Sequence, residues 1–199
     1  MIASPAQVRW LNGLPVITTE RTILRIAAMG EEPEIVDYVR RNRDHLQPWE
    51  PLRDQDYYDL RAWLGAAERD QDEARSGHSY RFRLILPSNP SEYIGTVSLR
   101  DIVFRALYTA TLGYSLDARY QGLGLMREAV AAVAWFAFHD LNLRRIEACY
   151  MPANEKSARL LKEIGFEVEG LMRSSLQVNG KWEDHYLTSL INYEWKGQK

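Results

Sequence analysis

The chain has 199 residues, of which 46% are hydrophobic and 26% charged, and its formal net charge is −2 at pH 7. The composition is typical of one globular domain with a sizeable core. The slightly negative net charge argues against electrostatic binding to the phosphates of a nucleic acid. The longest apolar run, residues 129–138, is too short to span a membrane. With no signal peptide at the N-terminus, a cytoplasmic protein is expected.

The first third of the chain predicts a strand followed by two helices. Residues 16–27 alternate as a strand does, and residues 31–46 carry Pro33 and acidic residues at their start, as a first helical turn does. Residues 54–77 place apolar side chains three and four apart, which predicts a second helix that ends at Gly77. A helical pair therefore precedes the main run of strands.

An antiparallel meander is predicted next, with strands at residues 79–86, 93–99 and 107–116. After it the pattern predicts, in order, a helix at 123–139, a strand at 144–151, a helix at 154–166, and strands at 170–178 and 181–193. Asn179-Gly180 is a strong hairpin signal between the last two strands. The order β-α-α-β-β-β-α-β-α-β-β predicts an α/β (α+β) fold with a mixed, mostly antiparallel sheet of about seven strands and helices on both faces.

The stretch RYQGLGLM opens the longest apolar helix, where two glycines need a reason because each costs about 1 kcal/mol in a helix. A glycine-rich turn before a helix presents free amides to a phosphate. A dinucleotide site would need a third glycine where Arg127 stands, and a P-loop would need Lys-Ser/Thr where Leu125 and Met126 stand. The alternatives are an Arg/Gln-x-x-Gly-x-Gly anion loop, matched by Gly122 and Gly124, and a tight structural turn.

The context of this turn resembles a known family. RYQGLG, between a meander and a long apolar helix, is similar to the acyl-CoA pyrophosphate loop of the GNAT acetyltransferases, and ACYMPANEKSARLLKEIGFEVEG is similar to the second half of their cofactor site. HLQPWEPLRD, MPANEKS and NGKWEDHYLTSL resemble more narrowly the RimJ group of ribosomal-protein alanine N-acetyltransferases. The likeness implies one GNAT domain over residues 1–199, with its core at about 17–195.

The resemblance also implies where acetyl-CoA would bind. The pantetheine arm would lie beside Leu116, as an extra strand between two strands that diverge. Asn154 would contact the pantetheine end and Ser157 the thiol, although Asn is also a preferred helix N-cap and Ser157 falls in the first turn. The pyrophosphate would be held by the amides of Gln121, Gly122, Leu123, Gly124, Leu125 and Met126.

The acceptor side of such a site would lie near the PWEP loop and the last hairpin. Some relatives carry a glutamate where this chain has Ala118, so the sequence does not show which residue acts as the general base. We expect Glu50 to be the first candidate for this base and Asp184 the second. The structural alternatives are a solvated loop acid for Glu50 and an edge pair for Asp184. An α-amino group, with a pKa of about 7.7–8.0, needs a much weaker base than a lysine at about 10.4.

The function expected from this resemblance is direct acetyl transfer from acetyl-CoA to the N-terminal alanine α-amine of a small-subunit ribosomal protein. No covalent enzyme intermediate is expected, because Cys149 has no activating partner in the sequence. The histidines show no ligand spacing, so no metal is expected. The alternatives are a small-molecule amine acetyltransferase and a non-catalytic ribosome-assembly protein. A monomer or homodimer that binds neither nucleic acid nor membrane is expected, and acidic stretches at 31–34 and 54–59 would attract a basic partner.

Overall fold

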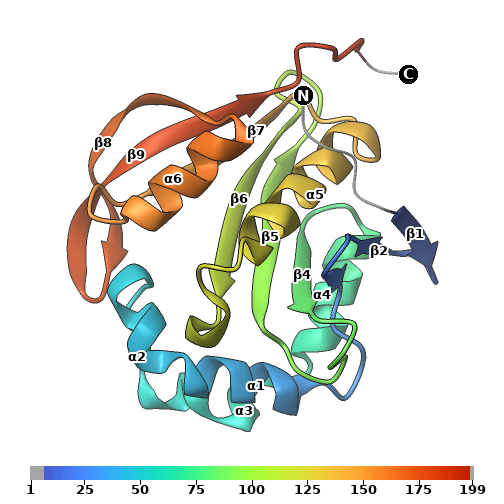
Figure 1. The fold of residues 1–199 in the computed structure, drawn as a ribbon, viewed down its shortest axis with the longest axis vertical. Coiled ribbons are helices and arrows are strands. Elements are labelled where there is room, and N and C mark those ends of the chain that lie inside the picture. Colours follow the sequence, from blue (N-terminus) through green and yellow to red (C-terminus); the bar gives the residue numbers. More distant parts are fainter. Residues whose placement is uncertain (1–6, 198–199) are drawn as a thin grey trace.

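The computed structural model describes residues 7–197, and its nine strands form one sheet in the order β1-β2-β3-β4-β5-β6-β7-β9-β8. Every neighbouring pair is antiparallel except β6 and β7, which are parallel. Figure 1 shows the sheet running from the short β1–β2 hairpin to the long β8–β9 hairpin. The strands are β1 (Gln7–Leu11), β2 (Leu14–Thr18), β3 (Ile23–Arg25), β4 (Tyr80–Ile85), β5 (Gly95–Val103), β6 (Thr109–Leu116), β7 (Arg145–Tyr150), β8 (Glu167–Val178) and β9 (Lys181–Ile191).

The longer helices lie on both faces of this sheet, as the sequence predicts. Two of them, α5 (Leu125–His139) and α6 (Glu155–Ile164), share one face, and α4 (Ala66–Arg75) packs against β4 from the other (Figure 1). The helix α1 and the shorter elements between it and α4 cover one end of the sheet. They are α1 (Glu32–Arg41), α2 (Arg43–Leu46), the 3-10 turns η1 (Gln47–Trp49) and η2 (Gln55–Tyr58), and α3 (Leu60–Trp63).

Two hydrophobic clusters hold these layers together. The larger one joins α5 to the sheet, where Phe136 packs edge-on against Tyr80 and Phe82. The smaller one lies beneath α1 and includes Ile35, Tyr38, Tyr58, Ile85 and Tyr93. The two clusters therefore lie on opposite faces of the central strands. Within residues 7–197, no helix is both long and apolar enough to cross a bilayer.

The sheet has nine strands instead of about seven, because the N-terminal region folds into more strands than its pattern predicts. The expected strand at 16–27 is β2 and β3, separated by a turn in which the Thr19 hydroxyl accepts from the Thr22 amide at 2.9 Å. β1 was not anticipated. It pairs with β2 through Asn12 and Gly13, both at positive φ (53° and 76°), the same Asn-Gly chemistry that makes the β8–β9 hairpin.

Both expected N-terminal helices are divided. The helix at 54–77 is interrupted after α3, where Gly65 adopts a left-handed φ of +72°. The helix at 31–46 is divided between α1 and α2 at Asn42, which is buried. The Asn42 side chain donates to the Tyr38 carbonyl at 3.0 Å and accepts from the Ala118 amide at 3.0 Å. This break ties the helical layer to the segment that follows β6.

Candidate active site

The glycine turn leaves a row of backbone amides without a partner at the start of α5. Gly122 and Gly124 both adopt left-handed backbone angles, with φ of +76° and +75°. The Gln121 amide donates to the Ala118 carbonyl at 3.4 Å, but the amides of residues 122–127 make no hydrogen bond within the described part of the chain. They lie at the positive end of a 15-residue helix. This arrangement fits an anionic group such as a pyrophosphate.

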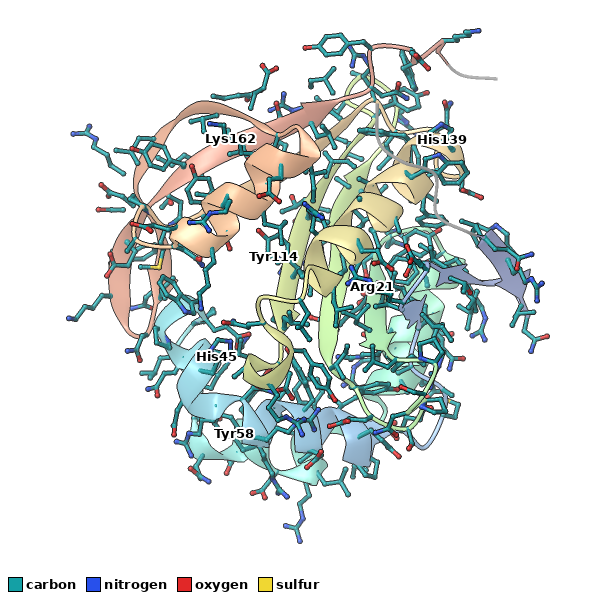
Figure 2. All side chains as sticks on the ribbon, viewed as in Figure 1. Arg21, His45, Tyr58, Tyr114, His139 and Lys162 are labelled. Atoms are coloured by element: carbon teal, nitrogen blue, oxygen red, sulfur yellow. The ribbon has the colours of Figure 1, made fainter. Side chains whose placement is uncertain are left out.

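Ion pairs on both sides hold the turn in place. On one side the Arg21 guanidinium donates to the Leu123 carbonyl at 2.8 Å and to Glu128 at 2.7 Å. Burial alone would raise the pKa of Glu128, but hydrogen bonds from Thr19 and Arg21 keep it below the ordinary value. Figure 2 labels Arg21 on the α5 side of the molecule. The glycine turn is therefore preorganised by residues about one hundred positions away in sequence.

On the other side, Asp117 anchors the 3-10 turn η3 (Ala118–Tyr120) that leads into the glycines. Asp117 is 1% exposed and accepts from Arg41 at 2.6 Å and from Arg119 at 2.8 Å. Burial would raise the pKa of Asp117, but these hydrogen bonds outweigh it and hold that pKa well below the usual range. Arg119, the first residue of the motif, also binds Glu92 at 2.6 Å. Its side chain is thus used to hold the loop.

Beside this turn, β6 and β7 separate as the resemblance implies. They pair over only three positions, from Thr109–Arg145 to Thr111–Glu147. Figure 1 shows the two strands together at one end and apart at the other. The remaining edge of β6, up to Leu116, has no strand on its β7 side within residues 7–197. An extended amide-containing chain fits along such an edge.

Asn154 and Ser157 lie together at the start of α6. The Asn154 side-chain oxygen Oδ1 accepts from the Ser157 amide at 3.1 Å, so Asn154 does cap the helix. The Ser157 hydroxyl faces Tyr114 of β6. Burial raises the pKa of Tyr114 to about 12, against a smaller lowering by the Ser157 hydroxyl. The Tyr114 hydroxyl is buried and makes no hydrogen bond of ordinary geometry to any described residue.

Tyr114 was not among the residues expected from the sequence. It follows Leu112 on the core-facing side of β6, so the alternation alone indicates a packing residue. Only the divergence of β7 and the approach of α6 place its hydroxyl beside Ser157. Figure 2 shows Tyr114 beside β6, between α5 and α6. The structure thus adds a second hydroxyl at the expected position of the thioester.

The Gln121 side chain connects the glycine turn to two helices. It contacts the His45 ring of α2 at 2.8 Å and accepts from Lys156 of α6 at 2.6 Å. Figure 2 labels His45 in the helical layer that contains α2. The sequence indicated only the backbone of Gln121. Its side chain instead links the layers on either side of the region where β6 and β7 diverge.

A cavity of about 330 Å³ opens on the opposite face of β6. It lies between the helical layer, the loop after η1, and strands β4 to β6, and both Ser115 and Glu50 line it. The Tyr38 hydroxyl lies 2.8 Å from the Ser115 hydroxyl. Because side chains alternate along a strand, Ser115 faces this cavity while Tyr114 and Leu116 face α5 and α6. The end of β6 therefore separates two sites that meet at its free edge.

Glu50, the first candidate base from the sequence, lies in the wall of this cavity. Burial raises the pKa of Glu50, and Arg53, 3.9 Å away, lowers it by less. The backbone carbonyl of Glu50 accepts from the Asn179 amide at 2.9 Å, which joins the loop to the tip of the last hairpin. This contact brings the PWEP loop and the last hairpin together, and acceptor entry beside them stays a prediction. Glu50 is a half-buried carboxylate with Arg53 as its ion-pair partner, and such partial desolvation suits a general base.

Asp184 occupies a different environment. It lies on β9, where it accepts from the Ser174 amide at 2.8 Å. Ser174 has a φ of +45° in an irregular part of β8, so the Asp184 carboxylate stabilises a distorted strand pair. Asp184 is not in the cavity wall. No three His, Cys, Asp or Glu side chains within residues 7–197 form a group suited to a metal ion.

Comparison with known proteins matches this geometry to a family. A family model described as the acetyltransferase (GNAT) domain matches residues 21–167. The chain is 34% identical over 179 residues to the [ribosomal protein uS5]-alanine N-acetyltransferase of Escherichia coli (strain K12), which covers 90% of this chain and 92% of that protein.

Solved structures show the same fold. The ribosomal-protein-S5-alanine acetyltransferase of Vibrio fischeri superimposes with a TM-score of 0.86 at 37% identity, over 92% of this chain and 99% of that one. Mycobacterium smegmatis RimJ, in complex with CoA-disulfide, superimposes with a TM-score of 0.80 at 28% identity, over 93% of this chain and 88% of that one. The mixed, mostly antiparallel sheet expected from the sequence is confirmed.

Proposed function

The chain belongs to the GNAT family of acetyl-CoA-dependent N-acetyltransferases, and we propose that its acceptor is the N-terminal alanine α-amine of a small-subunit ribosomal protein. The observation that carries this proposal is the 34% identity to a uS5-alanine N-acetyltransferase, which extends over nine-tenths of both chains. We therefore also propose a cytoplasmic location, where ribosomal proteins are made and assembled.

In this proposal the amides of residues 122–127 hold the CoA pyrophosphate, and the pantetheine lies along the free edge of β6 near Leu116. The pyrophosphate has room to approach the turn, because no protein atom lies within 4 Å of the position that a side chain of Gly122 would occupy. Bound acetyl-CoA supplies the thioester. Ser157 and Tyr114 face the place where its sulfur would lie, and either hydroxyl can donate to a developing thiolate.

The acceptor amine enters from the cavity on the opposite face of β6. The amine nitrogen attacks the thioester carbonyl directly, the C–S bond breaks, and the CoA thiolate leaves with a hydrogen bond from the Ser157 hydroxyl, which keeps its proton. Glu50 takes the proton that the amine loses. Its raised pKa makes it a stronger base than a solvated glutamate. Asp184 remains the second candidate for that role.

This proposal is tested by incubating the protein with acetyl-CoA and dissociated small-subunit proteins, and then mapping acetylated N-termini by mass spectrometry. One N-terminal alanine should be acetylated, and peptides with a blocked α-amine but free lysines should not react. Gly124→Glu is the matched negative control, because a carboxylate at the turn repels the pyrophosphate. Equal turnover of α-blocked peptides, or faster turnover of polyamines, would contradict the proposal.

A further inference from the structure

The cavity beside β6 has a charge opposite to that of the whole chain. One carboxylate, Glu50, lines it, against five guanidinium groups. We call these five the arginine wall: Arg43, Arg53, Arg81, Arg83 and Arg100. The chain as a whole has a net charge of −2, and its acidic stretches suggested a basic partner. The cavity itself therefore favours an anionic group.

Two members of the wall share a single counter-ion. Arg83 is 2% exposed and donates to Asp70 at 3.0 Å, while Arg81 donates to the other oxygen of Asp70 at 2.7 Å. One buried carboxylate thus compensates two guanidinium groups. The Nε atom of Arg83 is buried and has no hydrogen-bond partner among the described residues. A buried donor left unpaired costs about 1–3 kcal/mol, so a ligand acceptor at this position is favourable.

The other three members are less buried. Arg43 stacks on Tyr58 and Arg53 on Tyr57, each with its guanidinium carbon 4.4 Å from the ring centroid. Stacking orients the guanidinium planes. Arg43 uses one N–H group on Gln55 at 3.1 Å and Arg53 lies 3.9 Å from Glu50, and their remaining N–H donors are open to a planar anion. Arg100 extends from β5 and forms no ion pair with any described carboxylate. Together these groups offer more donors than the protein's own acceptors use.

We propose that the arginine wall selects acceptor N-termini that carry a carboxylate side chain within the first few residues after the alanine. This inference rests on the proposed function and specifies its substrate class. A cavity of about 330 Å³ is at the small end of ligand pockets, so only residues close to the α-amine fit. Carboxylates are the natural partners of arginine in proteins, through paired N–H···O hydrogen bonds. Polycationic acceptors such as polyamines are repelled by the same wall.

The test uses peptides that begin with alanine and differ only by Glu or Gln at position 2, 3 or 4. At one of these positions, kcat/KM should be at least about tenfold higher for Glu than for Gln, as expected for a charge-assisted hydrogen bond. The ratio should fall as salt is added. Arg100→Gln and Arg43→Gln should each reduce the Glu/Gln ratio severalfold, whereas Arg61→Gln, on α3 and outside the cavity, should preserve it.

Equal kcat/KM for the Glu and Gln peptides at all three positions, or a preference for Lys, would overturn the inference while leaving alanine acetylation intact. Failure to acetylate any alanine peptide would count against the proposed function instead. In that event, calorimetric binding of the Glu and Gln peptides to the enzyme loaded with CoA still decides the inference. Tighter binding of the Glu peptide supports it, and equal binding refutes it.

Discussion

Replacing Gly122 by alanine tests whether the free amides of the glycine turn bind the cofactor. A non-glycine residue in the left-handed region costs about 1–2 kcal/mol, and Gly122 has a φ of +76°. For a chain of this size that loss lowers Tm by about 2–8 °C. The added methyl group meets no protein atom within 4 Å, so no further loss of stability is expected.

The effect of Gly122→Ala on acetyl-CoA should be larger than its effect on stability. A methyl group where the pyrophosphate approaches would displace at least one charge-assisted hydrogen bond, which corresponds to a Kd about tenfold to 100-fold weaker. Isothermal titration calorimetry measures this directly.

Gly77→Ala is the matched control. Gly77 has a φ of +74°, has equally open surroundings and lies just after α4, outside the turn. Both variants should lose similar stability, and only Gly122→Ala should lose affinity. An unchanged Kd in folded Gly122→Ala protein would refute the cofactor role of the turn.

Three further changes probe the chemistry and the anchor of the site. Ser157→Ala should lower kcat by roughly tenfold to a few hundredfold with little change in the KM for acetyl-CoA, and an unchanged kcat under rate-limiting chemistry would leave Ser157 as a helix-start residue only. Glu50→Gln should lower kcat/KM by about 10²–10⁴-fold. It should also abolish the acid limb of the pH profile, which is the fall of kcat/KM at low pH. In the wild type the midpoint of this acid limb should lie above the ordinary glutamate pKa of about 4.3, because burial raises the pKa of Glu50 and a base must be ionised to act. An acid limb that is unchanged in the Gln variant would exclude Glu50 as the base. Asp117→Asn should lose about 3 kcal/mol at pH 7, because two guanidinium groups lose a buried partner. The folded pKa of Asp117 is lowered, so the wild-type advantage should be present above about pH 4 and shrink below it; equal urea midpoints for the two proteins at pH 7 would contradict the role of this ion pair.

Local patterns in the sequence determined most of the helices and strands and the position of the glycine turn. Gly122, Gly124 and Asn154 could be recognised because backbone conformation and capping depend on residues a few positions away. The same local reasoning merged β2 with β3, since the Thr19–Thr22 turn contains neither glycine nor proline. It also passed over Asn12-Gly13, although the signal was present.

Only the tertiary structure decided which side chains meet across the chain. Tyr114 lies near Ser157 at the place where β6 and β7 part after three paired positions, and no local pattern encodes where two strands separate. The arginine wall assembles α2, the loop after η1, β4 and β5 around one cavity, so its charge is invisible in the net charge of the chain. Side-chain alternation in β4 indicates that Arg81 and Arg83 share a face. That this face is covered by α4, with Asp70 as their shared partner, depends on packing between segments distant in sequence.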